Sequence, residues 1–152
     1  MTETTTPTLP YTTTIEVRDR CLCFRAQRAA RALGRRFDLA LKPVGLTNGQ
    51  FSILMSLNRP EPPRISDLAP FLAMDRTTLT AALKVLERRG LIETAPDEDD
   101  RRGKRLRLAA RGHAVLQDAM PIWRREHDAV DAALGEMDLA QLKAALMRLG
   151  EL

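Results

Sequence analysis

The sequence predicts a mainly α-helical chain of 152 residues with one small β-hairpin. Three observations support this prediction. Apolar residues recur at helical spacing over most of the chain, strand-forming residues cluster at 91–94 and 104–108, and the turn-rich segment PDEDDRRGK separates these two clusters. The hairpin directly follows a helix that begins after Asp75. This order is typical of a winged helix-turn-helix, here flanked by N- and C-terminal helices.

The helix after Asp75 is predicted to have two unlike faces. Asp75 is a suitable N-cap acceptor, and Gly90 lies just past the helix end, where only glycine adopts positive φ at little cost. Leu79, Leu83 and Leu86 form an apolar stripe. A helix with a small polar face can enter a major groove about 12 Å wide. We therefore expect base contacts from the opposite face, which carries Arg76, Thr77, Thr78, Thr80 and Lys84.

The hairpin has a basic tip that suits a minor groove or a phosphate backbone. Its second strand alternates charged and apolar residues, so that Leu106 and Leu108 share one face. Asp100 is expected to pair with an arginine and shape the wing, because a carboxylate beside phosphates would repel them. Ser66 is expected to contact the DNA backbone. The expected DNA contacts of the hairpin are Arg101, Arg102, Lys104 and Arg105; the plainer alternative is a solvated turn.

The same residues resemble a known family. Asp100 and Arg102, followed by five residues and Leu108, resemble the wing signature of the MarR (multiple antibiotic resistance regulator) family of bacterial transcription factors, and LERRGLI at 86–92 is similar to its helix-to-wing junction. The resemblance extends from about Glu16 to Leu152 and implies a dimeric, DNA-binding winged helix. Ala109 stands where the family usually has a threonine cap, and we expect this to cost about 1 kcal/mol.

The domain organisation follows from composition and helix signals. Residues 1–12 are rich in threonine and are predicted to form a flexible arm, and residues 13–152 form one domain. Within that domain, 13–45 and 110–152 are predicted dimerisation helices, and 46–109 is the winged helix-turn-helix lobe. Apolar stripes at both ends of a small chain need a surface to bury against, which favours a two-fold homodimer. Two recognition helices would then lie about 34 to 36 Å apart on a near-palindromic operator.

The sequence also predicts the boundaries of individual helices and one short strand. Capping boxes are expected at Thr13 with Glu16 and at Thr47 with Gln50. The first helix is expected to run from Thr13 to about Lys42. A very short strand is expected at Ile65, followed by an N-cap at Ser66. After the wing, we expect a helix from Ala110 to Leu134 that is bent by Pro121, and a last helix from Asp138 to Leu149.

Composition narrows the class of protein. The net charge is +4 and the pI is about 9.6, which suits a polyanionic partner. No stretch approaches the roughly 20 apolar residues of a membrane span, so we expect a cytoplasmic protein without a membrane partner. His113 and His127 fall in no catalytic motif and are interpreted as solvated or satisfied helix residues. We expect no enzyme activity, no cofactor and no metal site.

Two cysteines leave two interpretations open. The segment LCFRAQRAAR resembles the organic-hydroperoxide repressors of the same family, which implies that Cys23 is a redox sensor. The tyrosines that support the sensing cysteine in those proteins correspond to Phe37 and Asn48 here, and phenylalanine cannot donate a hydrogen bond. We therefore prefer the alternative, in which Cys21 and Cys23 are small buried hydrophobic residues, and expect Cys23→Ser to leave any peroxide response unchanged.

An effector pocket is a further hypothesis. A crevice between the dimer helices and the DNA-binding lobe would hold a small aromatic or anionic effector, with an arginine facing its carboxylate. The candidate residues are Phe24, Arg28, Arg31, Phe51, Leu54 and Trp123. The alternative is that the apolar members are ordinary core residues.

Together these patterns predict a sequence-specific transcriptional regulator that binds double-stranded DNA as a homodimer. We expect a repressor that a small molecule or an oxidant releases from its operator. The alternative is a dimeric helical module that binds a ligand or a protein and no longer binds DNA.

Overall fold

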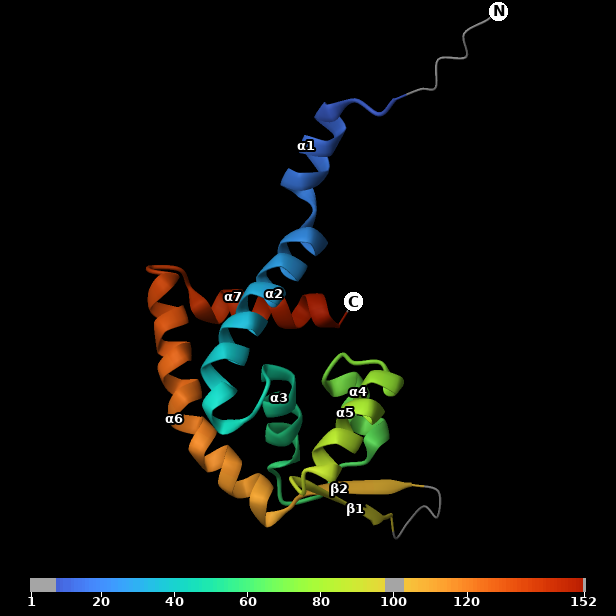
Figure 1. The fold of residues 1–152 in the computed structure, drawn as a ribbon. Helices are drawn as coiled ribbons and strands as arrows, with labels where there is room; N and C mark the ends of the chain where they lie inside the picture. The colour runs from blue at the N-terminus through green and yellow to red at the C-terminus, as the bar shows by residue number, and fades with distance from the viewer. Residues whose placement is uncertain (1–7, 98–102, 152) are drawn as a thin grey trace, which may run out of the picture. The chain divides into compact units, whose positions relative to one another are not determined.

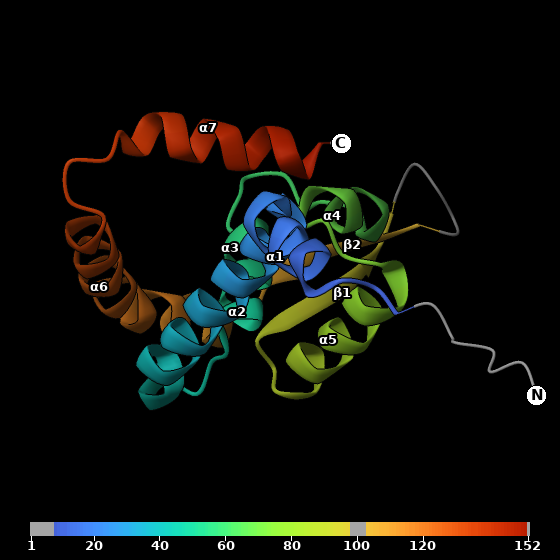
Figure 2. The same cartoon turned by 90° about the horizontal axis from the view of Figure 1, so that it is seen from above.

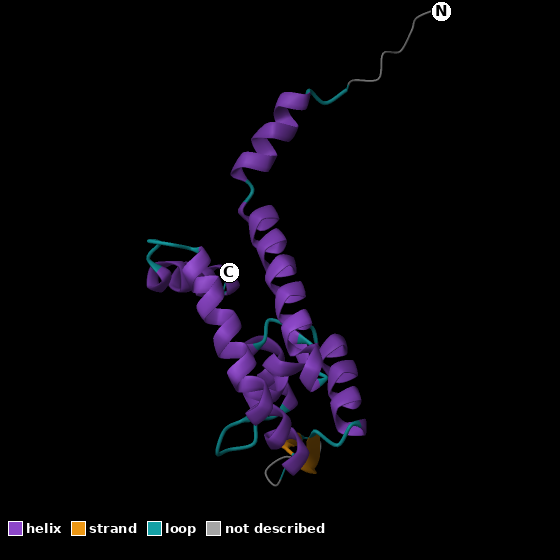
Figure 3. Cartoon of the chain, turned by 60° about the vertical axis from the view of Figure 1, so that its left-hand side comes forward, coloured by secondary structure: helices purple, strands orange, loops and turns teal. Residues whose placement is uncertain are grey.

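The structure is a computed structural model that describes residues 8–97 and 103–151. Its elements, in chain order, are α1 (Tyr11–Arg20), α2 (Leu22–Leu41), the 3-10 helix η1 (Lys42–Val44), α3 (Asn48–Leu57), α4 (Ile65–Phe71), α5 (Arg76–Arg88), β1 (Ile92–Pro96), β2 (Lys104–Leu108), α6 (Ala110–Ala133) and α7 (Leu139–Gly150). The two strands form an antiparallel hairpin, and every other described element is helical (Figures 1 and 3). The predicted fold class is confirmed.

Two compact units divide the chain, Met1–Arg35 and Arg36–Leu152. The first unit contains α1 and most of α2, and α1 buries none of its residues against the described chain. The second unit contains the end of α2 and all the elements that follow. The predicted single domain over 13–152, with its internal division, stays a prediction.

The start of the first helix differs from the prediction. α1 begins at Tyr11, and the expected capping box of Thr13 with Glu16 does not form its start. Pro10 is the N-cap residue, in an extended conformation (φ −61°, ψ 143°), and its carbonyl oxygen accepts a hydrogen bond from the Thr13 amide at 3.0 Å. Because Thr13 already lies inside the first turn, its hydroxyl cannot cap the helix.

The predicted single helix to Lys42 is also interrupted at Cys21, which has ψ 103°. The Cys21 sulfur accepts a hydrogen bond from the Phe24 amide at 3.3 Å, and the Cys21 carbonyl accepts one from the Arg25 amide at 3.3 Å. These are the contacts of an N-cap residue. Cys21 therefore ends α1 and starts α2.

The predicted capping box at the start of α3 is confirmed. The Thr47 hydroxyl accepts from the Gln50 amide and the Gln50 side-chain oxygen accepts from the Thr47 amide, each at 3.2 Å. Two of the free amides at this helix start are thus satisfied reciprocally.

We expect Thr47→Ala to lower the free energy of unfolding by about 1 kcal/mol, because it removes one side of this box. Chemical denaturation followed by circular dichroism measures the change. Thr77→Ala, on the exposed face of α5, is the matched control and should change stability by less than about 0.5 kcal/mol. Equal effects of the two substitutions would contradict a specific capping role for Thr47.

The helix-turn-helix consists of α4 and α5. The prediction of a strand at Ile65 is wrong by one residue and that of a cap at Ser66 by two. Arg64 is the extended residue and bridges to Arg105, and Ile65 is the first residue of α4. The Arg64 amide donates to the Asp67 carboxylate at 3.4 Å, so Asp67 rather than Ser66 satisfies a free amide here.

The two ends of α5 agree with the sequence. The Asp75 carboxylate caps the start by accepting from the Thr78 amide at 2.8 Å. Gly90, just past the end, has φ 67°, where a side chain would be strained. The cap and the glycine therefore set the length of this helix.

The hairpin packs beside α5, as Figure 2 shows. Ile92 pairs with Leu108 and Pro96 with Lys104, so β2 has the predicted bounds and β1 runs two residues beyond the predicted run. Leu106 is buried, as is Leu108, while the intervening residue is exposed. The predicted alternation is confirmed, and it directs one face of the hairpin into the core.

The long helix α6 follows the wing and matches its prediction to within one residue. Ala109 is its N-cap residue and makes no side-chain cap bond, as expected. Pro121 lies inside α6, which follows a curved path (Figure 1). After the turn at Gly135, Asp138 caps α7 by accepting from the Gln141 amide at 3.0 Å.

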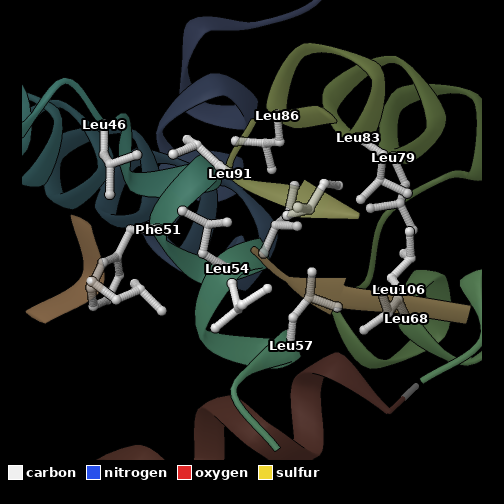
Figure 4. Close-up of a cluster of buried hydrophobic side chains, with 14 of the residues drawn as sticks. Leu46, Phe51, Leu54, Leu57, Leu68, Leu79, Leu83, Leu86, Leu91 and Leu106 are labelled. Atoms are coloured by element: carbon white, nitrogen blue, oxygen red, sulfur yellow. The ribbon is translucent and has the colours of Figure 1, made fainter. Parts of the chain in front are cut away.

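The core of the second unit is mostly leucine, contributed by α3, α4, α5, both strands and α6 (Figure 4). Its most deeply buried side chains are Leu41, Ile53, Leu54, Leu68, Leu79, Leu86, Leu91 and Leu106. By contrast, α7 buries none of its residues against the described chain. Large apolar side chains that remain exposed include Leu22, Phe24 and Leu33 on α2 and Leu146, Met147 and Leu149 on α7.

Candidate nucleic-acid interface

The α5 helix separates its apolar and polar faces as its sequence pattern indicates. Leu79, Leu83 and Leu86 are buried. The five residues predicted to contact bases are all exposed: Arg76, Thr77, Thr78, Thr80 and Lys84. The helix therefore presents a continuous polar face that no described element covers.

Two of the exposed threonines already donate hydrogen bonds within α5. The Thr78 hydroxyl donates to the Asp75 carboxylate at 2.5 Å, and the Thr80 hydroxyl donates to the Arg76 carbonyl at 2.7 Å. Their oxygen lone pairs remain available as acceptors. Of the five, Arg76 and Lys84 carry the long cationic side chains that suit phosphates and guanine edges.

The cap of α5 is a charged one. The hydroxyl and the backbone amide of Thr78 hold the pKa of Asp75 below its ordinary value. The carboxylate form therefore persists at neutral pH, and its contribution to helix stability is lost only as the pH falls through this lowered pKa. The recognition helix keeps its cap under the conditions in which DNA binding is measured.

A cleft joins α5 to the start of α4 and to the wing. Its cavity volume is about 360 Å³. The lining residues are Arg64, Ile65, Ser66, Arg76, Thr80, Gly103 and Lys104. Four residues predicted independently as DNA contacts, Ser66, Arg76, Thr80 and Lys104, thus come together from three elements. A shallower hollow on α5, lined by Arg76, Thr77, Thr80, Ala81 and Lys84, continues this surface.

The wing residues fall into three groups. Lys104 is exposed and lines the cleft. Asp100, Arg101 and Arg102 lie outside the described residues, and their predicted roles stay predictions. Arg105 has a different environment from the one predicted, because its side chain is 31% exposed and is held within the wing base.

Arg105 bonds to two parts of the protein. Its Nε donates to the Asp97 carboxylate at 3.1 Å and its Nη1 donates to the Pro62 carbonyl at 3.1 Å. Arg64 also donates from Nε to Asp97. The predicted DNA contact of Arg105 stays a prediction, but these bonds show that its guanidinium has a structural role.

Sequence reasoning missed Asp97 and Arg64. Asp97 is buried, although it is followed by Glu98, Asp99 and Asp100 in a run that is typical of a solvated turn. Nothing in that run distinguishes the buried carboxylate. The usable signal was the position of Asp97 directly after a strand. Strand register decides whether a side chain at such a position faces the core or solvent, so burial of Asp97 was one of two possible outcomes.

The predicted effector pocket draws on both units. Phe24, Arg28 and Arg31 belong to the first unit and the other candidates to the second, so the pocket stays a prediction. Phe51 and Leu54 are buried core residues. Trp123 stacks on Phe51 with ring centroids 6.3 Å apart. For these apolar members, the alternative of ordinary core packing describes the observed contacts.

His127 lies in an aromatic cluster next to that core. Its ring is 4.0 Å from that of Trp123 and 5.0 Å from that of Phe37. The Nδ1 atom is buried without a hydrogen-bond partner among the described residues. The interpretation of His127 as a solvated or satisfied helix residue is therefore wrong for this nitrogen.

The cysteines are not buried in the described chain. Cys23 is exposed and its sulfur accepts from the Gln27 side-chain amide at 3.1 Å. Cys21, at the break between the helices, is half-buried. The preferred interpretation of both as small buried hydrophobic residues is thus wrong for Cys23. Phe37 is buried, and its ring contacts that of His127 edge-on.

The fold and the basic face define a class: a winged helix-turn-helix protein with its polar recognition helix exposed beside the wing. The sequence profile of the MarR family matches residues 46–104. The organic hydroperoxide resistance transcriptional regulator of Bacillus subtilis is 30% identical over 130 residues, which cover 86% of this chain and 87% of that relative. The chain belongs to the MarR family.

Two further comparisons extend this finding. The transcriptional activatory protein BadR of Rhodopseudomonas palustris is 33% identical over 99 residues, which cover 63% of this chain and only 57% of BadR. The crystal structure of the M. tuberculosis transcriptional regulator MosR in complex with DNA superposes with a TM-score of 0.78 at 39% identity, covering 87% of this chain and 95% of that chain. The winged helix of the present chain is thus similar to one that has been solved on DNA.

Proposed function

We propose that the protein is a sequence-specific transcriptional regulator that binds double-stranded DNA as a homodimer. The observation that carries this proposal is the continuous polar surface formed by α5, the start of α4 and the wing base. It presents Arg76 and Lys104 to solvent around the cleft, and Lys84 along the hollow that continues it. Clustered cations beside an exposed recognition helix favour a phosphate backbone and a groove over a neutral partner.

The proposed homodimer rests on the apolar side chains left exposed at both ends of the chain. Leu146 is 53% exposed and Met147 66% exposed on α7, and Leu22 is 64% exposed on α2. Helices with such stripes need an apolar surface, and a second copy of the chain supplies a matching one. A two-fold dimer would place two copies of α5 about one helical repeat apart, which favours a near-palindromic operator.

We further propose that the protein represses transcription from its operator and is released by a small aromatic or anionic molecule or by an oxidant. A dimer bound across a promoter excludes polymerase, and an effector that prefers a different arrangement of the subunits lowers the population that binds DNA. A cytoplasmic location belongs to the same proposal. Among the described helices, none is long and apolar enough to cross a bilayer.

The experiment that tests DNA binding is a titration of the purified protein with the DNA upstream of its own gene, at several salt concentrations. Six to ten phosphate contacts would lower the affinity by about 10³ to 10⁵ between 50 and 200 mM salt. An unrelated duplex of equal length is the control. Absence of binding at low salt would favour the rival, a dimeric helical module that binds a ligand or a protein.

Oxidation is the first release mechanism to test, because Cys23 is exposed. The exposure of Cys23 reverses the expectation from the sequence that Cys23→Ser leaves any peroxide response unchanged. We expect peroxide to weaken DNA binding by the wild-type protein and Cys23→Ser to remove that response while leaving the affinity of the reduced protein unchanged. DNA titrations before and after peroxide measure both. Cys21→Ser shows whether the second sulfur is needed. A full peroxide response in Cys23→Ser would exclude Cys23 as the sensor.

A further inference from the structure

Asp97 stands out at the base of the wing as a charged residue in the core. Only 4% of the residue is exposed, and its side chain is fully buried. A buried carboxylate costs several kcal/mol unless it is paired and hydrogen-bonded. In the structure, the Nε atoms of Arg64 and Arg105 both donate to it. Because burial of this carboxylate is costly, we expect it to have a role that its position at the wing base explains.

The two arginines come from different segments. Asp97 directly follows β1, Arg105 belongs to β2, and Arg64 precedes α4, 33 residues earlier in the chain than Asp97. The carboxylate therefore joins the hairpin to the N-cap residue of α4, the first helix of the helix-turn-helix. It acts between elements and not only within the hairpin.

Backbone contacts support the same junction. The Leu106 amide donates to the Pro63 carbonyl at 3.0 Å, and Arg64 bridges to Arg105. The Asp97 amide donates to the Gly103 carbonyl at 3.0 Å, which closes the described end of the hairpin. The segment before α4 thus pairs with β2 through an isolated β-bridge, and Asp97 neutralises the two cations brought together by this pairing.

This junction also shapes the candidate interface. Arg64 lines the cleft together with Ser66, Arg76 and Lys104. The position of Lys104 relative to Arg76 therefore depends on how the hairpin is fixed to the start of α4. A hairpin released from this junction would keep its cations but would no longer hold them at a set distance from α5.

We propose that Asp97 is a positioning residue for DNA binding, which clamps the wing base to the start of α4 so that the wing and α5 engage neighbouring grooves together. This inference rests on the proposed function and extends it to a residue that does not touch DNA. If Asp97 acted only through its charge, its removal would change the DNA affinity in the opposite direction. A carboxylate near phosphates repels them, so its removal would strengthen binding if charge alone mattered.

The test compares Asp97→Asn with Glu93→Gln. Both substitutions remove one negative charge from the same strand or its end, but the Glu93 side chain is 52% exposed and pairs only at the surface, with Arg107 at 2.8 Å. We expect Asp97→Asn to weaken binding to the upstream DNA about tenfold, because charged buried hydrogen bonds are lost. Glu93→Gln should leave affinity within about twofold of wild type.

Footprinting adds a readout that a general loss of stability would not produce. We expect Asp97→Asn to lose protection of the minor groove from hydroxyl radicals while retaining protection of guanine N7 in the major groove. Affinity equal to or tighter than wild type, or an equal loss of both protections, would overturn the proposal. Absence of any protection by the wild-type protein would instead contradict the proposed function itself, whereas protection of the major groove alone by the wild-type protein would overturn the positioning role.

If Asp97→Asn does not fold, Arg105→Lys tests whether the junction at Asp97 positions the wing. Lysine keeps the positive charge, so a direct phosphate contact would survive, but it cannot make the two-pronged bond to Asp97 and Pro62. We expect the same selective loss of minor-groove protection. A footprint identical to that of the wild-type protein would overturn the positioning role.

Discussion

Replacing Gly112 with alanine is expected to lower the free energy of unfolding by roughly 3 kcal/mol, the upper end of the usual cost of overpacking. Gly112 is buried in the first turn of α6, where a Cβ would lie 2.0 Å from the Leu91 carbonyl oxygen and 3.3 Å from Leu108 Cδ2. The Leu91 oxygen cannot move away freely, because it accepts a hydrogen bond from the Ala109 amide at 3.0 Å. The substitution must therefore separate α6 from the start of the wing.

Gly34→Ala is the matched control for this prediction. Gly34 lies inside α2, and a Cβ there would have nothing within 4 Å. Alanine is the better helix former, so the free energy of unfolding of this variant should rise by about 0.5 to 1 kcal/mol. Urea denaturation should therefore show a lower free energy of unfolding for Gly112→Ala and a higher one for Gly34→Ala. A Gly112→Ala protein within 0.5 kcal/mol of wild type, on the order of measurement error, would show that the close approach of α6 to Leu91 is not required.

Replacing Arg76 with glutamate is expected to weaken DNA binding about 100-fold, equivalent to about 2.7 kcal/mol. Arg76 is the first residue of α5, is exposed, and lines both the cleft and the hollow. The substitution removes a cation from the proposed groove contact and places an anion beside phosphates. Fluorescence anisotropy with labelled upstream DNA at one fixed salt concentration measures the loss.

The fold should tolerate this change, which separates binding from stability. A carboxylate in the first turn interacts favourably with the helix dipole, so the helical circular dichroism signal should be retained. Arg124→Glu, on the exposed surface of α6, makes the same change in net charge away from the candidate interface and should leave affinity within about twofold. If Arg76→Glu binds as tightly as Arg124→Glu, α5 is not the groove-binding element.

The capping signals show where local sequence is sufficient and where it is not. Thr47 with Gln50 and Thr13 with Glu16 have the same pattern, yet only the first pair starts a helix. The difference is Pro10, whose extended conformation begins α1 before Thr13 is reached. A cap motif predicts which bonds are available, and the residues just before it determine whether the helix has already begun.

The wing base illustrates a second limit. The sequence predicted the bounds of β2 and the burial of Leu106 and Leu108, but it assigned Arg105 to DNA and overlooked Asp97. The structural bonds of Arg105 and the burial of Asp97 escaped prediction for one reason. The partner of these residues, Arg64, lies far away in the chain, and the pairing that brings it near appears only when the segment before α4 meets β2.

By itself, the sequence determined the order of the hairpin and of the helices from α3 onward, the caps at Thr47 and Asp75, and the division of α5 into buried leucines and an exposed polar face. These features depend on periodicity and on hydrogen bonds between residues no more than four apart, which the chain encodes locally. Tertiary structure alone decided the burial of Asp97, the enclosed Nδ1 of His127 and the tight fit at Gly112. Each depends on the packing of segments that are distant in sequence, because burial is a property of neighbours in space.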